Sequence, residues 1–82
     1  MLSLPVLKHK LEKSLPGALI EITDEDAQHQ GHGASGKHLA LTITYAGFKS
    51  MPLVEQHRMI YKILAEEMKE QIHALKISTK VP

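Results

Sequence analysis

The sequence predicts an α+β domain in which helices cover one face of a small mixed β-sheet. Residues 38–45 and 72–79 alternate apolar and polar side chains, which is the period of a half-buried strand. Residues 53–68 instead repeat their apolar side chains at helical spacing. A strand, a helical crossover and another strand favour a right-handed connection between parallel strands. With a helix and a strand ahead of them, the expected order is αββααβ, a two-layer domain with a three-stranded sheet.

Length and composition indicate one domain over residues 1–82. A chain of 82 residues buries roughly 60% of its unfolded surface, so its core is modest. No apolar run approaches the roughly 18 residues of a membrane span, and residues 1–10 lack the long apolar core of a signal peptide. We therefore expect a cytoplasmic protein without membrane contact, either a monomer or a weak homodimer when alone.

Cysteine content and charge exclude several classes of function. The chain has no cysteine, so it has neither disulfides nor a C-x-x-C metal site. Its formal charge of +1 gives no strong field for steering nucleic acid. No nucleophile is set beside a base, and we find no carboxylate pair or phosphate-binding loop, so we do not expect an enzyme.

The first helix is expected over residues 3–14. Ser3 is a suitable N-cap, and Pro5 falls in the first turn, where a missing N–H costs nothing. Apolar positions then recur at helical spacing, at Leu4, Leu7, Leu11 and Leu15. Pro16-Gly17 ends the helix.

Two strands follow, and a long loop separates them. Residues 18–23 form a short β-type segment, with apolar Leu19 and Ile22 around Glu21. Residues 24–37 hold three glycines, two histidines and no large apolar side chain, and so long a loop in a compact domain is usually functional. Strand 38–45 places four apolar side chains on one face, Leu39, Leu41, Ile43 and Tyr45. The pair is expected to be antiparallel.

A turn-rich connection at 46–51, with room for a short helical turn, leads to a long helix that begins near Pro52. The expected buried stripe of this helix is Leu53, His57, Ile60, Tyr61, Leu64 and Met68, with a smaller pair of Met59 and Ile63 under the first helix. Opposite-charge support comes from Glu66 with Lys62 and Lys69.

The last strand, residues 72–79, is expected to bury Ile72 and Ala74, with Leu75 and Ile77 as further candidates. His73 lies at the corner between helix and strand. Alternation points its side chain away from its apolar neighbours, toward the open side. It is one of six histidines, which is a high count for 82 residues, and histidine is the commonest metal ligand. The residues alone leave open whether His73 is a ligand or a solvated surface side chain.

Four segments of the sequence resemble the BolA family over nearly the whole chain. They are IEITDEDAQHQGH, HLALTITYAGF, QHRMIYKILAEEM and IHALKISTKVP. The family fold is similar to a class II KH domain, which agrees with the α+β pattern above. The family carries an acid, any residue, serine, two residues and then histidine or cysteine after the first strand. On this chain the acid is Asp24, Asp26 replaces the serine, and His29 takes the histidine-or-cysteine position.

The resemblance implies a shared metal cluster. BolA proteins bind monothiol glutaredoxins, and a two-iron, two-sulfur cluster is held by the glutaredoxin cysteine, by glutathione and by the BolA protein. The ligands implied here are His73 and His29, with the extra loop histidine His32 as a competing ligand. Two histidines cannot hold such a cluster alone, and the chain has no cysteine, so the thiolates must come from the partner. No cofactor is therefore expected in the isolated chain.

Three further residues are assigned from the same comparison. His38, at the start of a strand, is expected to be structural, capping the strand or bonding the loop backbone. His57 lies on the apolar stripe, where a histidine is more often a hydrogen-bonded core residue, although the family carries the pair His57 and Arg58. We keep His57 and Arg58 as candidate partner-binding residues. Arg58 is a candidate contact for glutathione, a carboxylate or a phosphate.

The alternative function is a DNA-binding transcriptional regulator of stress response and morphology, because the family has been discussed in those terms. Candidate nucleic-acid contacts are Arg58, Lys62, Lys76 and Lys80. Against this, a KH domain clamps the nucleic-acid backbone with a Gly-x-x-Gly loop, and the equivalent connection at 46–51 has one glycine. The favoured hypothesis is cluster trafficking or iron and stress regulation with a glutaredoxin partner.

Overall fold

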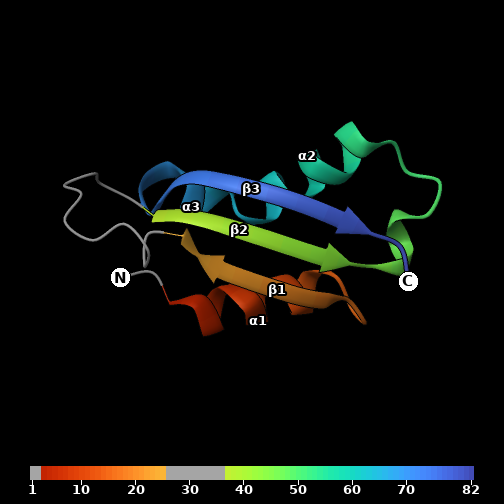
Figure 1. Ribbon diagram of the computed structural model, residues 1–82, viewed down its shortest axis with the longest axis horizontal. Helices are drawn as coiled ribbons and strands as arrows, with labels where there is room; N and C mark the ends of the chain where they lie inside the picture. The colour runs from red at the N-terminus through yellow and green to blue at the C-terminus, as the bar shows by residue number, and fades with distance from the viewer. Residues whose placement is uncertain (1–2, 26–36) are drawn as a thin grey trace.

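The computed structural model describes residues 3–25 and 37–82. Its elements follow in the order α1 (Leu4–Ser14), β1 (Leu19–Asp24), β2 (Lys37–Thr44), the 3-10 turn η2 (Ala46–Phe48), α2 (Leu53–Ile63), α3 (Ala65–Glu70) and β3 (Ile72–Lys80). The three strands form one layer and the helices lie behind it, so the sheet face toward the viewer is uncovered (Figure 1). The predicted α+β two-layer architecture is confirmed.

The sheet has the order β1-β2-β3, with β1 antiparallel and β3 parallel to the central strand β2. The expected antiparallel pair and the expected parallel pairing of the last strand are confirmed, and the structure identifies β2 as the strand that β3 pairs with. The parallel ladder contains one irregularity. Lys37 pairs with Ile72, but the next residue, His38, pairs with Ala74. His73 is therefore an extra residue in β3, which is the arrangement of a β-bulge.

The bulge shifts the alternation of β3 by one residue. Ile72 is buried before it, whereas Leu75 and Ile77 are the half-buried inward residues after it. Ala74 is exposed, so the expectation that it is buried is wrong. The expectation assumed an unbroken period of two, and one inserted residue sends every later side chain to the other face.

The inward face of the sheet and the helices enclose one apolar core. Among the described residues its fully buried members are Leu7, Leu11, Leu15, Ile20, Leu39, Leu41, Ile43, Phe48, Ile60, Leu64 and Ile72. In β1 the inward residues are Ile20 and the half-buried Ile22, while Leu19 is exposed. The predicted inward face of β2 is confirmed.

The long helix predicted after Pro52 is two helices, because α2 ends at Ile63 and α3 begins at Ala65. The residue between them, Leu64, is fully buried. Leu53 and Tyr61 are 61% and 41% exposed, so the predicted stripe is wrong at these two positions. The rest of the predicted apolar stripe is confirmed at Ile60, Leu64 and Met68, and the predicted second pair, Met59 and Ile63, also packs against the core.

Polar contacts tie the helices to one another and to the sheet. Lys10 of α1 donates to both carboxylate oxygens of Glu67 in α3, with Nζ–O distances of 2.9 and 3.0 Å. Gln56 donates to the carbonyl of Met51 at 2.8 Å and accepts a hydrogen bond from the Thr79 hydroxyl of β3. The predicted pair of Glu66 and Lys69 is present at 3.7 Å.

Candidate functional site

His73 is an exposed imidazole at the join between α3 and β3. The helix ends at Glu70, one turn residue follows, and β3 starts at Ile72. Burial of Ile72 fixes the start of the strand, and the bulge at the next position carries His73 outward. Bulges are over-represented where a side chain is re-aimed near a functional site. The exposure expected from the sequence is thus confirmed, but the bulge rather than regular alternation produces it.

His38 lies directly beside His73. The two ring centroids are 5.2 Å apart and the ring planes are inclined by only 26°, so the imidazoles are stacked. His38 is half-buried on the central strand, and its Nε2 atom is buried. The parallel register of β2 and β3 brings the two together from distant places in the sequence.

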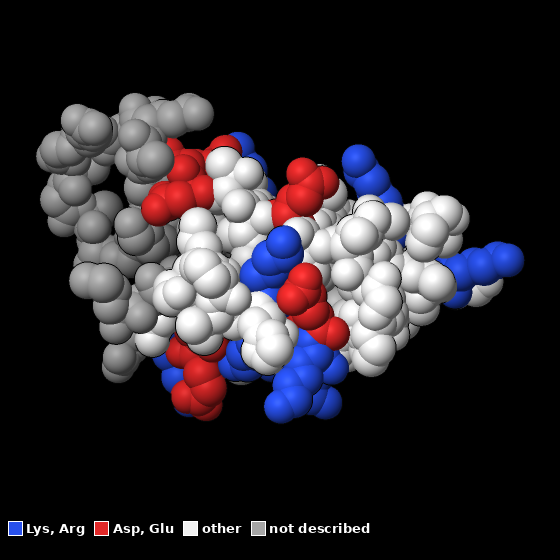
Figure 2. Space-filling view, turned by 90° about the horizontal axis from the view of Figure 1, so that it is seen from below, with Lys and Arg blue, Asp and Glu red and all other residues white. Residues whose placement is uncertain are grey.

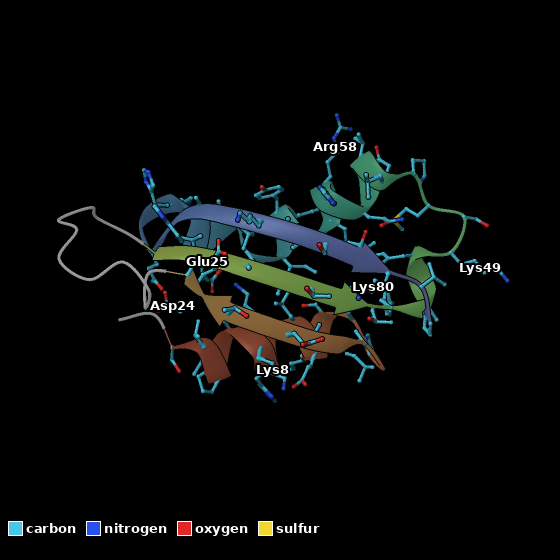
Figure 3. All side chains as sticks on the ribbon, in the orientation of Figure 1. Lys8, Asp24, Glu25, Lys49, Arg58 and Lys80 are labelled. Atoms are coloured by element: carbon cyan, nitrogen blue, oxygen red, sulfur yellow. The ribbon has the colours of Figure 1, made fainter. Side chains whose placement is uncertain are left out.

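His29 and His32, with Asp26, lie outside the described residues. The chain leaves the described part at Glu25 and returns at Lys37. Asp24 and Glu25 lie at the sheet end where β2 and β3 begin (Figure 3). Since His73 belongs to the first residues of β3, both ends of the loop meet the sheet at the same end as His73.

An ion pair crosses this end of the sheet. Lys76 of β3 lies 3.4 Å from the carboxylate of Glu25, which follows β1. The Lys76 side chain is 78% exposed, so solvent screens the pair and its contribution to stability is small. Lys76, a candidate nucleic-acid contact, is therefore engaged with a carboxylate of its own domain.

His57 and Arg58 are on α2, away from His73. His57 is half-buried, as its place on the apolar side predicts. Arg58 is 73% exposed and pairs with Glu55 at 3.2 Å. Its side chain projects from α2 away from the sheet end where Asp24 and Glu25 lie (Figure 3). The structure thus separates the candidate ligand His73 from the candidate partner contact Arg58.

The four candidate nucleic-acid residues come from two elements. Arg58 and Lys62 are on α2, and Lys76 and Lys80 are on β3. Arg58 and Lys62 line a shallow surface pocket of about 290 Å³ together with Met51, Glu55 and Met59. The side formed by α1 and β1, viewed from below, shows acidic and basic side chains mixed among uncharged ones (Figure 2). That side therefore offers no field of one sign to a phosphate backbone.

The connection that would correspond to a KH phosphate clamp has a structural explanation instead. A Cβ on Gly47 would overlap the ring of Tyr45, so the glycine is needed for this close approach. The Tyr45 ring in turn meets buried Phe48 edge-on, with centroids 5.2 Å apart. Gly47 is explained by packing and requires no phosphate ligand.

The described residues contain no ready-made cluster of metal ligands. Within residues 3–25 and 37–82, no group of three or more histidine, aspartate or glutamate side chains converges. The same part of the chain contains no helix long and apolar enough to cross a membrane. A groove of about 530 Å³ between α1 and β1 is lined by Leu4, Pro5, Lys8, Ile20, Glu21, Ile22 and Thr23. This lining contains neither histidine nor cysteine, the side chains whose imidazole and thiolate groups suit iron.

The fold and site together define a small α+β domain with an exposed histidine on a bulged strand end. A family model described as BolA-like protein matches residues 11–82. The chain therefore belongs to the BolA-like family, and the family recognised from the sequence motifs is confirmed.

Relatives and solved structures agree with the assignment to the BolA-like family. The chain is 38% identical over 84 residues to SufE-like protein 1, chloroplastic/mitochondrial, of Arabidopsis thaliana, covering 93% of this chain and 23% of that protein. It is 30% identical over 77 residues to the DNA-binding transcriptional regulator BolA of Haemophilus influenzae, covering 94% of this chain and 75% of that protein. The solved BolA domain of SufE1 from Arabidopsis thaliana superposes with a TM-score of 0.81 at 37% identity, covering 100% of this chain and 96% of that chain.

The chain spans only part of some of these relatives. It covers 51% of Protein BOLA1, chloroplastic, of Arabidopsis thaliana, at 38% identity over 82 residues. The activities of the longer relatives as whole proteins therefore bear on this chain only as proposals.

Sequence reasoning missed the stack of His38 on His73. A signal for it was present, because both histidines come at or next to the start of an expected strand, and the last strand was expected to pair in parallel with one of the first two. The starts of adjacent parallel strands lie at one sheet edge. The bulge, which determines the direction of the His73 side chain, could not be predicted from the sequence.

Proposed function

We propose that this domain binds a monothiol glutaredoxin and supplies His73 as a ligand to a two-iron, two-sulfur cluster shared with the glutaredoxin cysteine and glutathione. The observation that carries the proposal is the exposed imidazole of His73 on the bulge of β3. A side chain so placed is accessible to a partner without any rearrangement of the core. Membership of the BolA-like family supports the choice of partner class.

The donor set of this chain fits a shared cluster. Neutral imidazole is a suitable iron ligand. Cysteine is absent, so every thiolate has to come from the partner and from glutathione. The described residues bring one exposed histidine to the site, and His29 or His32 is the proposed second donor from the segment between Glu25 and Lys37. Replacement of cysteine thiolates by imidazoles raises the reduction potential of such a cluster.

The biological role proposed is iron-sulfur cluster trafficking or regulation in response to iron and stress. The domain acts as a binding module whose ligand completes a partner's site, and it is not proposed to catalyse a reaction. The cytoplasmic location stays a prediction, and the Arabidopsis relatives carry names that place them in chloroplasts or mitochondria.

The test is a titration of cluster-loaded monothiol glutaredoxin, with glutathione present, followed by visible absorption and circular dichroism. Wild-type protein is expected to change both spectra, and His73→Ala to abolish the change. His9→Ala is the matched control, because His9 is also an exposed histidine but lies on α1. Comparison of His29→Ala with His32→Ala identifies the loop ligand. Equal spectra for wild type and His73→Ala would refute the proposal.

A second candidate function is DNA binding. It is favoured by the names of two relatives that are 30% identical, the DNA-binding transcriptional regulators BolA of Haemophilus influenzae and Escherichia coli. In this chain the exposed pair Arg58 and Lys62 on α2 is the proposed contact.

The salt dependence of duplex binding tests this function. Replacement of both residues by alanine is expected to reduce the slope of log K against log salt by about 2, since each phosphate contact contributes about 0.9. Lys13→Ala with Lys8→Ala is the control on α1. An unchanged slope would remove α2 as the interface, and no binding at low salt would remove the function.

A further inference from the structure

The stacked pair of histidines is asymmetric in its surroundings. His38 is on the central strand β2, which is hydrogen-bonded on both sides, and its ring is half-buried with Nε2 inside. His73 is the extra residue of the bulge on the edge strand β3, and it is exposed. One ring of the pair therefore lies partly inside the fold, and the other lies on its surface.

An exposed side chain on a bulge would otherwise sample several rotamers. Histidine has staggered χ1 wells and a broad χ2, so its two ring nitrogens would point in several directions. The stacked contact at 5.2 Å and 26° places the His38 ring against one face of the His73 ring, while His73 as a residue is exposed. Ordering the ring in advance removes a cost that binding would otherwise have to meet.

We propose that His38 is a positioning residue, which holds the His73 imidazole by ring stacking in the orientation that binds a partner's metal. This inference rests on the proposed function for the role of His73, but the stacking itself does not. His38 acts through His73 and is not itself a ligand. The role requires a flat ring at position 38 and does not require a ring nitrogen.

Three substitutions separate stacking from ligation and from hydrogen bonding. His38→Phe keeps a flat ring and removes both nitrogens. His38→Asn keeps a polar group and removes the ring, and His38→Ala removes both. Stacking predicts that Phe behaves as wild type, whereas Asn and Ala behave alike. A ligand role, or a role through a hydrogen bond, predicts that Phe is as damaging as Ala.

The first measurement is made on the isolated protein without any cluster. Ring protons of His73, assigned in NMR spectra by comparison with His73→Ala, are expected to be shifted upfield by the ring current of residue 38. The shift should persist in His38→Phe and disappear in His38→Asn and His38→Ala. Amide spectra of each variant verify that the fold is intact. Absence of the shift in wild type, or its persistence in His38→Ala, would overturn the proposal.

The second measurement is the affinity for cluster-loaded glutaredoxin. Loss of the ring is expected to weaken binding about two- to tenfold, the ordering cost of one side chain, and His38→Phe to stay within about twofold of wild type. A His38→Phe variant as weak as His38→Ala would overturn the positioning role. If the NMR shifts behave as expected but His73→Ala leaves the cluster spectra unchanged, the cluster function fails and the stacking of the two rings stands.

Discussion

Ser50 has a backbone conformation that ordinary residues avoid. Its φ of 67° is the one positive φ at a non-glycine residue in the described ranges. For L-residues this left-handed conformation costs roughly 1–2 kcal/mol, which glycine escapes. Glycine in turn loses about 0.5–1 kcal/mol more on folding, because its unfolded chain is freer. Ser50→Gly is therefore expected to raise the free energy of unfolding by about 0.5–1 kcal/mol.

The measurement is urea and thermal unfolding, with a rise in Tm of about 2–8 °C expected for a domain of this size. Ser50→Ala is the control that removes the hydroxyl but keeps the Cβ, and it should not stabilise. Gly17 gives the opposite test, since its φ is +84° and an added Cβ would meet nothing within 4 Å. Gly17→Ala should cost about 1 kcal/mol through the backbone alone. A destabilised Ser50→Gly, or equal stabilisation by Ser50→Ala, would refute the reasoning.

The remaining predictions concern the core and its polar ties. Ile60 is fully buried, so Ile60→Ala should destabilise by about 2–5 kcal/mol in urea unfolding, while Leu53→Ala, at a position 61% exposed on the same helix, should change stability by less than about 0.5 kcal/mol. Comparable losses of unfolding free energy at the two positions would contradict the burial of Ile60 and the exposure of Leu53. Lys10→Ala should cost about 0.5–1 kcal/mol through its part-buried pair with Glu67, and a double-mutant cycle with Glu67→Gln should show coupling that falls with added salt.

The architecture could be predicted because several local signals agree with one another. Ser3 accepts a hydrogen bond from the Val6 N–H as an N-cap should, and Pro5 falls in the first turn. The alternation of residues 38–45 gave the inward face of the central strand without error, because that strand has no irregularity after its first residue. Where the hydrophobic period of a segment agrees with the capping and helix-breaking residues at its ends, the fold can be predicted from the sequence.

The errors in the strand and in the helix have different origins. The period of two failed at Ala74, because the bulge changes the phase of β3. The predicted helical stripe failed at Leu53 and Tyr61, which are both exposed on α2 ahead of the break at Leu64. Neither the bulge nor the break is announced by a glycine or proline at the site. Leu64, at the break, is buried, so the interruption of the helix is maintained by packing rather than by a local stop signal. Tertiary contacts of this kind cannot be predicted from the residues next to the break.

The site was predicted less completely than the fold. The exposure of His73 was expected from regular alternation, although the bulge produces it. The role of His73 came from the family resemblance, and His29 lies outside the described residues. His38 was expected to support the strand or the loop backbone. The structure adds its ring contact with His73, which needs the strand register and could not be obtained from spacing.

The failure at Ala74 and the candidate ligand are one feature of the molecule. A regular strand would place His73 and Leu75 on one face, and burial of Leu75 would draw the imidazole toward the helices. The extra residue separates these requirements, since Leu75 packs inward while His73 stays outside. Bulges disrupt ladder pairing, so one at this position calls for a compensating use. Exposure of an imidazole at the sheet end, where a partner can reach it, is such a use.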